Sequence, residues 1–128
     1  MVNILSKILK SRLHLRFVFN SLIRYNSNLM SKYVGINPVK RDVPIIVSLT
    51  SYEARFKDLE ISLYSLLNQS LKPDRIILWL SDEIESLNDL PYEITKYIKN
   101  GLEIRFVKDI GSYTKAIYAF KEYQEAII

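Results

Sequence analysis

Residues 42–128 predict an α/β fold built on a parallel, doubly wound sheet. Three short runs of apolar and β-branched residues, at 43–50, 75–80 and 102–107, alternate with segments of helical periodicity. Apolar runs of this kind suit strands that are buried on both faces, and strands that alternate with helices form parallel sheets. We therefore expect three layers and the element order β-α-β-α-β-α.

The first helix is expected over residues 56–69. One face of it carries four leucines, Leu59, Leu63, Leu66 and Leu67. The segment Lys72-Pro73-Asp74 ends this helix before the second strand, and an acidic loop, Ser81-Asp82-Glu83, follows that strand.

The second helix is expected over residues 92–99, after Pro91, and Asn100-Gly101 is a typical helix stop. The third is expected over 112–125, with Ser112 or Thr114 capping its start. Its expected apolar face consists of Ala116, Ile117, Phe120 and Tyr123 or Gln124. Residues 126–128 resemble the first residues of a fourth strand, so we expect the sequence to be a fragment or a gene truncated within the domain.

The charge is divided unevenly along the chain. The 128 residues carry a formal charge of +4. Residues 1–41 contain eight Lys or Arg and no acid, whereas residues 42–128 contain ten Lys or Arg and fourteen Asp or Glu. The sequence therefore joins a basic arm and linker (1–41) of charge +8 to an acidic body (42–128) of charge −4.

The arm predicts a basic amphipathic helix over residues 3–24. Its apolar residues fall at 4, 5, 8, 9, 13, 17 and 22, close to a 3.6-residue period. Its apolar runs are too short for a spanning helix and too interrupted for a secretory signal. We expect peripheral contact with an anionic membrane through Lys7, Lys10, Arg12 and Arg16.

Two alternatives remain for the arm, a surface helix packed on its own body and a mitochondrial presequence. Nucleic-acid binding is not expected, because the arm lacks a base-reading motif and the body is acidic. His14 is interpreted as a polar-face residue, and residues 26–40 as a linker.

Several site classes are excluded by composition and spacing. The sequence has no Cys, which excludes disulfides and cysteine-based metal sites. A single His excludes a His-rich metal site and a Ser-His-Asp triad. Neither standard glycine-rich phosphate loop is present, so dinucleotide-binding and P-loop ATPase functions are excluded as well.

Candidate ligand-binding residues follow the strands, because open α/β sheets bind ligands beyond the carboxyl ends of their strands. Thr50, Ser51 and Arg55 follow the first strand, and Asp82 follows the second. After the third, Lys115 lies in the first turn of a helix, where an anion such as a diphosphate would relieve its conflict with the helix dipole.

Each of these residues also has a plain structural interpretation. Lys115 fits a surface lysine on a capped helix. Arg55 fits a surface ion pair with Glu53 or Asp58, and Asp82 fits a turn or cap residue.

Three ordered blocks of the body resemble a known family. They are IIVSLTSYEARF at 45–56, SLLNQSLKPDRIILWLSDE at 65–83 and GLEIRFVKDIGSYTKAIYAF at 101–120. Together they resemble the N-terminal half of a GT-A-type glycosyltransferase domain of the bacterial polysaccharide and capsule type. The resemblance implies a cytoplasmic enzyme, peripheral on the inner membrane face, that moves a sugar from a nucleotide-sugar such as a UDP-sugar to a saccharide or lipid-linked acceptor.

The resemblance also implies roles for residues. Nucleotide contacts fall on Thr50, Ser51, Tyr52 and Arg55, the base contact on Asp82, and the diphosphate or sugar contact on Lys115.

The aspartate-rich DXD motif of that family, which holds a divalent Mn or Mg ion, would follow the next strand, so its ligands are absent from this sequence. We therefore expect poor nucleotide binding and no sugar transfer from this sequence alone. The alternative is a non-enzymatic truncated α/β module or a membrane-associated interaction protein.

Overall fold

The computed structural model describes Val18, residues 35–84 and residues 86–128. The chain divides into two compact units, Met1–Lys32 and Tyr33–Ile128. In the first, Val18 is helical and exposed. The rest of the predicted arm lies outside the described residues, including His14 and the expected membrane contacts Lys7, Lys10, Arg12 and Arg16. Within the described residues, no helix is both long enough and apolar enough to cross a bilayer.

The second unit is built on three parallel strands, as the sequence predicts. They are β1 (Ile46–Thr50), β2 (Arg75–Ser81) and β3 (Leu102–Val107), in the sheet order β1-β2-β3. The first strand begins three residues later than predicted. Pro44 has no N–H to donate to a ladder, and Ile45 forms only an isolated bridge.

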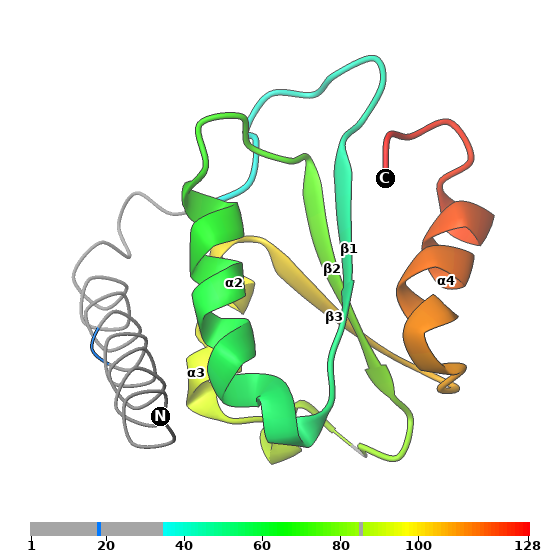
Figure 1. Cartoon of the computed structure of the whole chain (residues 1–128). Coiled ribbons are helices and arrows are strands. Elements are labelled where there is room, and N and C mark those ends of the chain that lie inside the picture. Colours follow the sequence, from blue (N-terminus) through cyan, green and yellow to red (C-terminus); the bar gives the residue numbers. More distant parts are fainter. Residues whose placement is uncertain (1–17, 19–34, 85) are drawn as a thin grey trace, which may run out of the picture. The chain divides into compact units, whose positions relative to one another are not determined.

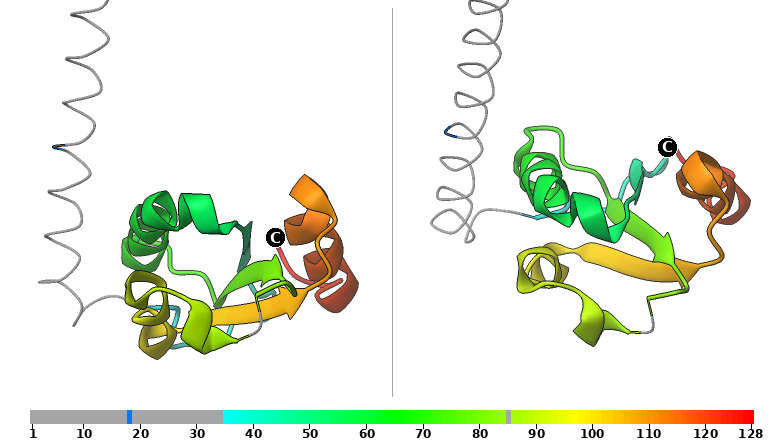
Figure 2. Two further views of the ribbon diagram at one scale, coloured as in Figure 1. Left: turned by 90° about the horizontal axis from the view of Figure 1, so that it is seen from below. Right: turned by 60° about the horizontal axis from the view of Figure 1, so that its bottom comes forward.

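Three helices cover the two faces of this sheet, α2 (Phe56–Asn68), α3 (Tyr92–Thr95) and α4 (Thr114–Glu122). Short 3-10 turns precede or follow them: η1 (Glu53–Arg55), η2 (Leu87–Asp89), η3 (Ile98–Asn100) and η4 (Gly111–Tyr113). Helices α2 and α3 lie on one face and α4 on the other (Figures 1 and 2). The α/β class and the three-layer arrangement are therefore confirmed.

The core is organised around β2, whose side chains are buried on both faces. Ile76, Leu78 and Leu80 pack toward α2 and α3, whereas Ile77 and Trp79 form a second cluster with residues of the α4 side. The predicted leucine face of α2 meets the first cluster, where Leu59, Leu63 and Leu67 are buried and Leu66 is partly buried.

The chain returns to the sheet after α4 on the other side of β1. Ile127 forms a parallel bridge with Ile45, in which its N–H donates to the Pro44 carbonyl (2.9 Å) and its carbonyl accepts from Ile46 (2.8 Å). The Ile45 carbonyl instead accepts from the start of β2, at Asp74 (2.8 Å). Ile127 and β2 therefore lie on opposite sides of β1, and the sheet reverses its direction of growth there.

This reversal explains why α4 lies on the face opposite α2. Parallel crossovers are almost always right-handed, so a crossover that runs in the opposite direction across the sheet places its helix on the opposite face. The expectation that residues 126–128 approach the sheet as a strand agrees with the bridge at Ile127.

The predicted helix at 92–99 is wrong in its length. It divides into α3 and η3, because Tyr97 turns into the core, where it is 3% exposed, and its N–H bonds three residues back, to Ile94. The predicted stop is confirmed. Gly101 has a φ of 102°, and a Cβ there would come within 2.8 Å of the Ile36 side chain.

The predicted apolar face of the last helix is confirmed at Tyr123, which packs against the second cluster, and wrong at Ile117 and Phe120. Ile117 and Phe120 are 39% and 58% exposed, whereas Thr114 and Ala119 are buried against the sheet. The periodicity identifies an apolar side correctly, but the sheet contacts the neighbouring side because Tyr118 stacks on Trp79, with ring centroids 5.5 Å apart.

A buried ion pair joins the two helices of the first face. Lys96 Nζ lies 2.7 Å from Glu60 Oε1, and the two side chains are 10% and 5% exposed. Burial alone would lower the pKa of Lys96, but the hydrogen bond to Glu60, the interaction with Tyr97 and the charge of Glu60 together more than offset this effect, and the pKa is raised.

Asp74 joins the segment before β1 to the start of β2. Its carboxylate accepts hydrogen bonds from the Ile45 N–H (2.8 Å), Asn37 Nδ2 (2.7 Å) and Arg41 NH1 (2.7 Å). The backbone hydrogen bond from Ile45 lowers the pKa of Asp74, burial opposes it, and Asn37 and Arg41 lower it further. Residues 35–41 of the predicted linker and arm are thus tied to the sheet.

We predict that Lys96→Met lowers the free energy of unfolding by about 3 kcal/mol, because it removes the Lys96 ammonium from the buried Glu60 carboxylate. Urea denaturation measures this change. Lys99→Met, at an exposed position nearby, is the control and should change stability by less than about 0.5 kcal/mol. Equal losses in the two variants would contradict the prediction.

We predict that Asp74→Asn lowers Tm at neutral pH and that the difference from the wild type shrinks on acidification. A carboxyl whose pKa is lowered on folding stabilises the protein above its ordinary value of 3.8, and this stabilisation disappears as the pH falls through the folded pKa. Thermal melts between neutral pH and about pH 2 measure the effect. Asp42→Asn, at an exposed position, is the control, and a pH-independent difference for Asp74→Asn would contradict the interpretation.

Candidate functional site

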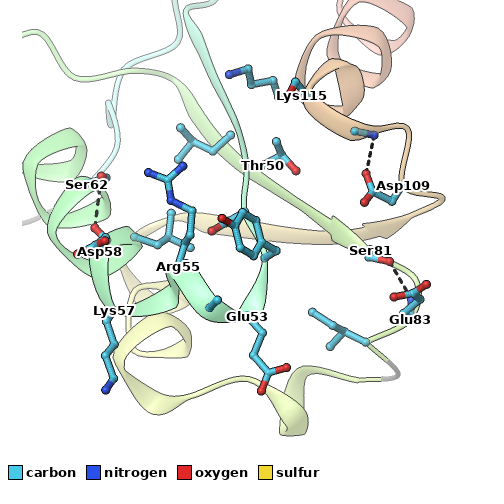
Figure 3. Close-up of a pocket in the computed structure, with 18 residues that line it drawn as sticks. Thr50, Glu53, Arg55, Lys57, Asp58, Ser62, Ser81, Glu83, Asp109 and Lys115 are labelled. Atoms are coloured by element: carbon cyan, nitrogen blue, oxygen red, sulfur yellow. Dashed lines mark hydrogen bonds between the residues drawn. The ribbon is translucent and has the colours of Figure 1, made fainter.

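A cleft of about 1360 Å³ opens at the carboxyl edge of the sheet, between the start of α2 and the start of α4. Five residues that the sequence singles out line it: Thr50, Ser51, Tyr52, Arg55 and Lys115. They come from segments more than 50 positions apart in the sequence, and Figure 3 shows Thr50, Arg55 and Lys115 around one opening.

The first wall is the turn from β1 into α2. Thr50 ends β1, and its hydroxyl donates to the Trp79 carbonyl (3.0 Å), which fixes the strand end against β2. Tyr52 is extended and 61% exposed, and its carbonyl accepts from the Arg55 N–H (2.9 Å). The chain thus turns abruptly into η1 and presents Arg55 at the base of α2.

The second wall is the start of α4. Gly111 adopts a φ of 70°, and its N–H donates to Asp109 Oδ1 (2.8 Å). The same oxygen accepts from the Thr114 hydroxyl (3.2 Å), which in turn accepts from the Ile110 N–H (3.1 Å).

The predicted capping of this helix by Ser112 or Thr114 is therefore wrong. The 3-10 turn η4 precedes α4, and neither hydroxyl caps the first turn of the helix. Asp109 instead holds the turn together from the loop side, because its carboxylate can accept from both Gly111 and Thr114.

Arg55 and Lys115 are exposed and carry the free positive charges of the cleft. Across residues 35–84 and 86–128, neither side chain forms an ion pair or a hydrogen bond, so Arg55 is not paired with Glu53 or Asp58. Figure 3 shows the two side chains reaching from opposite walls, with Thr50 between them.

Asp82 does not line the cleft, although the sequence placed it among the candidates. Its N–H donates to the Val107 carbonyl (2.9 Å), so the turn after β2 stays bonded to β3, on the side away from β1. Ser81 and Glu83 line the cleft instead, and the Ser81 hydroxyl accepts from the Glu83 N–H (3.2 Å).

The first turns of α2 were not identified from the sequence as part of the cleft. Asp58 and Ser62 line the cleft from this helix, one turn apart. The sequence could have identified them, because polar residues at i and i+4 share a helix face and this helix starts directly after the first strand, next to the expected ligand-binding edge.

The carboxylates of the cleft do not form a metal site. Glu53, Asp58, Glu83 and Asp109 line it, but in the described part of the chain no three His, Asp or Glu side chains gather closely enough to hold an ion. The divalent cation that the resemblance implies therefore does not fit these residues, and no step through it is derived for them.

Comparisons with models of protein families, with curated proteins and with solved structures find no match for this chain. Two unpaired cations beside hydroxyl groups can bind a phosphate or diphosphate by charge-assisted hydrogen bonds. The exposed Tyr52 ring adds an aromatic surface at the same opening.

We predict that Asp109→Ala lowers the free energy of unfolding by about 1 kcal/mol, as the loss of a helix-end acceptor typically does. Chemical denaturation measures the change. Ser112→Ala, which removes the hydroxyl that sequence reasoning favoured as a cap, should cost less than about 0.5 kcal/mol. A larger loss of stability in Ser112→Ala than in Asp109→Ala would contradict the conclusion that Asp109, and not Ser112, holds the start of the helix.

Proposed function

We propose that this domain binds the diphosphate of a nucleotide-sugar between Arg55 and Lys115, as the donor-binding part of a GT-A-type glycosyltransferase. The observation that carries the proposal is the pair of unpaired cations on opposite walls of one cleft. Neither side chain forms an ion pair with a described carboxylate, so both stay available to an anionic ligand, although Glu53, Asp58, Glu83 and Asp109 also line the cleft.

The position of the cleft in the sheet supports the proposal. Ligands of open α/β sheets bind beyond the carboxyl ends of the strands, where the order of strands reverses. Here the reversal occurs at β1, which lies between β2 and the bridge formed by Ile127. The cleft begins at Leu49 and Thr50, at the carboxyl end of β1.

The walls of the cleft differ in the chemistry they offer a nucleotide-sugar. Arg55 can bond two phosphate oxygens at once through its planar guanidinium, and Lys115 adds a compact charge. Tyr52 offers an exposed ring on which a base can stack, and Thr50 and Ser51 offer hydroxyls. On the β2 side, Ser81 and Glu83 occupy the place that the resemblance gave to Asp82.

The proposal for the described residues is limited to donor binding. Transfer to a saccharide or lipid-linked acceptor at the inner face of a membrane, with Mn or Mg, is proposed only for a whole enzyme that also carries the DXD motif. Because the present carboxylates form no metal site, none of them is proposed as a catalytic group.

We predict that the chain binds UDP more tightly than uridine, because only UDP carries the diphosphate. Arg55→Met and Lys115→Met should each weaken UDP binding about tenfold, corresponding to about 1.4 kcal/mol, and leave uridine binding unchanged. Isothermal titration calorimetry at low ionic strength measures both ligands, and raising the salt concentration should weaken UDP binding alone.

Lys121→Met is the matched control, because Lys121 is an exposed lysine of the same helix that does not line the cleft. Equal affinity for UDP and uridine would contradict the proposal and favour the non-enzymatic α/β module. A loss in Lys121→Met as large as that in Lys115→Met would show that only overall charge matters.

A further inference from the structure

We infer that Ser48 is a positioning residue. Its hydroxyl holds the first turn of α4 against β1, in the position that places Lys115 in the cleft. This inference rests on the proposed function, since it concerns the diphosphate site. Ser48 does not line the cleft itself and acts only through the backbone of Lys115.

The hydrogen bonds of Ser48 have a fixed direction. The Trp79 indole N–H, which can only donate, gives its proton to Ser48 Oγ over 2.9 Å. A hydroxyl has one proton of its own, and Ser48 Oγ donates it to the carbonyl oxygen of Lys115. The result is a chain from β2 through β1 to α4, which we call the Trp79–Ser48–Lys115 chain.

The β2 end of this chain is firmly held. Trp79 is 1% exposed and stands opposite Thr50 and Arg105 in the ladders of the central strand. Its ring stacks on Tyr118 of α4, and the Arg105 guanidinium lies 5.3 Å from the ring centroid. The indole N–H can therefore hold the Ser48 hydroxyl in one orientation.

The α4 end depends on this support. The Lys115 side chain has no partner among the described residues, so its location follows from where its backbone is held. The helix buries only Thr114 and Ala119, and its apolar residues Ile117 and Phe120 are exposed. Hydrogen bonds rather than a broad apolar surface therefore hold its first turn, from Ser48 on the sheet side and from Asp109 and Ile110 to Thr114 on the loop side.

Other hydroxyls near the cleft do not make this link. Thr50 donates to the Trp79 carbonyl and so joins β1 to β2, whereas Ser62 bonds to the Asp58 carbonyl within α2. Ser48 spans 67 positions of sequence to reach the helix that carries the cation. Its removal should therefore act on the α4 wall of the cleft and not on the α2 wall.

The test measures UDP binding by calorimetry for the wild type and four variants: Ser48→Ala, Ser48→Thr, Lys115→Met and Ser48→Ala/Lys115→Met. Ser48→Ala removes both hydrogen bonds of this chain and should weaken UDP binding about fivefold, the effect of losing the one that reaches Lys115, whereas Ser48→Thr keeps the hydroxyl and should stay within about twofold of the wild type. The double variant should bind no more weakly than Lys115→Met, because Ser48 acts through Lys115.

Ser86→Ala is the control for a general loss of stability. Ser86 caps η2 with its hydroxyl and does not line the cleft, so this variant should lose stability but keep UDP affinity. Trp79 is the only Trp of the chain, and its fluorescence reports whether each variant keeps the native environment of the indole. Ser48→Thr keeps the test decisive if Ser48→Ala folds poorly, because an affinity as low as that of Lys115→Met in a folded Ser48→Thr would overturn the inference.

The remaining outcomes separate the two proposals. If the wild type binds UDP no better than uridine, both the proposed function and this inference fail. If Lys115→Met weakens UDP binding but Ser48→Ala does not, the proposed function stands and the inference is wrong. If the losses of Ser48→Ala and Lys115→Met add in the double variant, Ser48 acts on the fold and not on Lys115.

Discussion

The two backbone hydrogen bonds between Ile127 and the start of β1 determine how the rest of the domain is arranged. They place the returning chain on the side of β1 away from β2, which reverses the growth of the sheet. Because crossovers are right-handed, the reversal carries α4 to the face opposite α2 and α3. The starts of α2 and α4 then lie on either side of the carboxyl end of β1, and the cleft opens between them.

The two walls of this cleft are held by different forces. Helix α2 buries Leu59, Leu63 and Leu67, each contributing about 1.5–3 kcal/mol of apolar burial. Helix α4 is held largely by contacts of individual side chains, among them the Ser48 hydroxyl on the Lys115 carbonyl, the Tyr118 ring on Trp79 and the Arg105–Glu122 ion pair. Apolar burial has no preferred direction, whereas a hydrogen bond fixes two atoms, so single substitutions should shift the α4 wall more readily.

The sequence predicted the sheet and most of the cleft because both follow from local patterns. The apolar run from Ile76 to Leu80 favours a strand buried on both faces, and the rule that ligands bind at strand ends brought Arg55 and Lys115 together. Asp82 was misplaced because the direction of its turn depends on a bond to Val107, a non-local partner. The inner face of α4 was misjudged because periodicity does not show that Trp79 would select Tyr118 over Ile117.

The electrostatics of the body connect its stability with its proposed function. With fourteen acids against ten bases, residues 42–128 could neutralise every cation they contain. Two of the acids outside the cleft form ion pairs that stabilise the fold, Asp74 with Arg41 of the preceding segment and Glu60 with Lys96. Within the cleft, Asp109 accepts hydrogen bonds from Gly111 and Thr114, which hold its carboxylate at the start of α4. Arg55 and Lys115 therefore stay without an ion-pair partner among the described residues, and an anion bound between the two walls would be attracted by both.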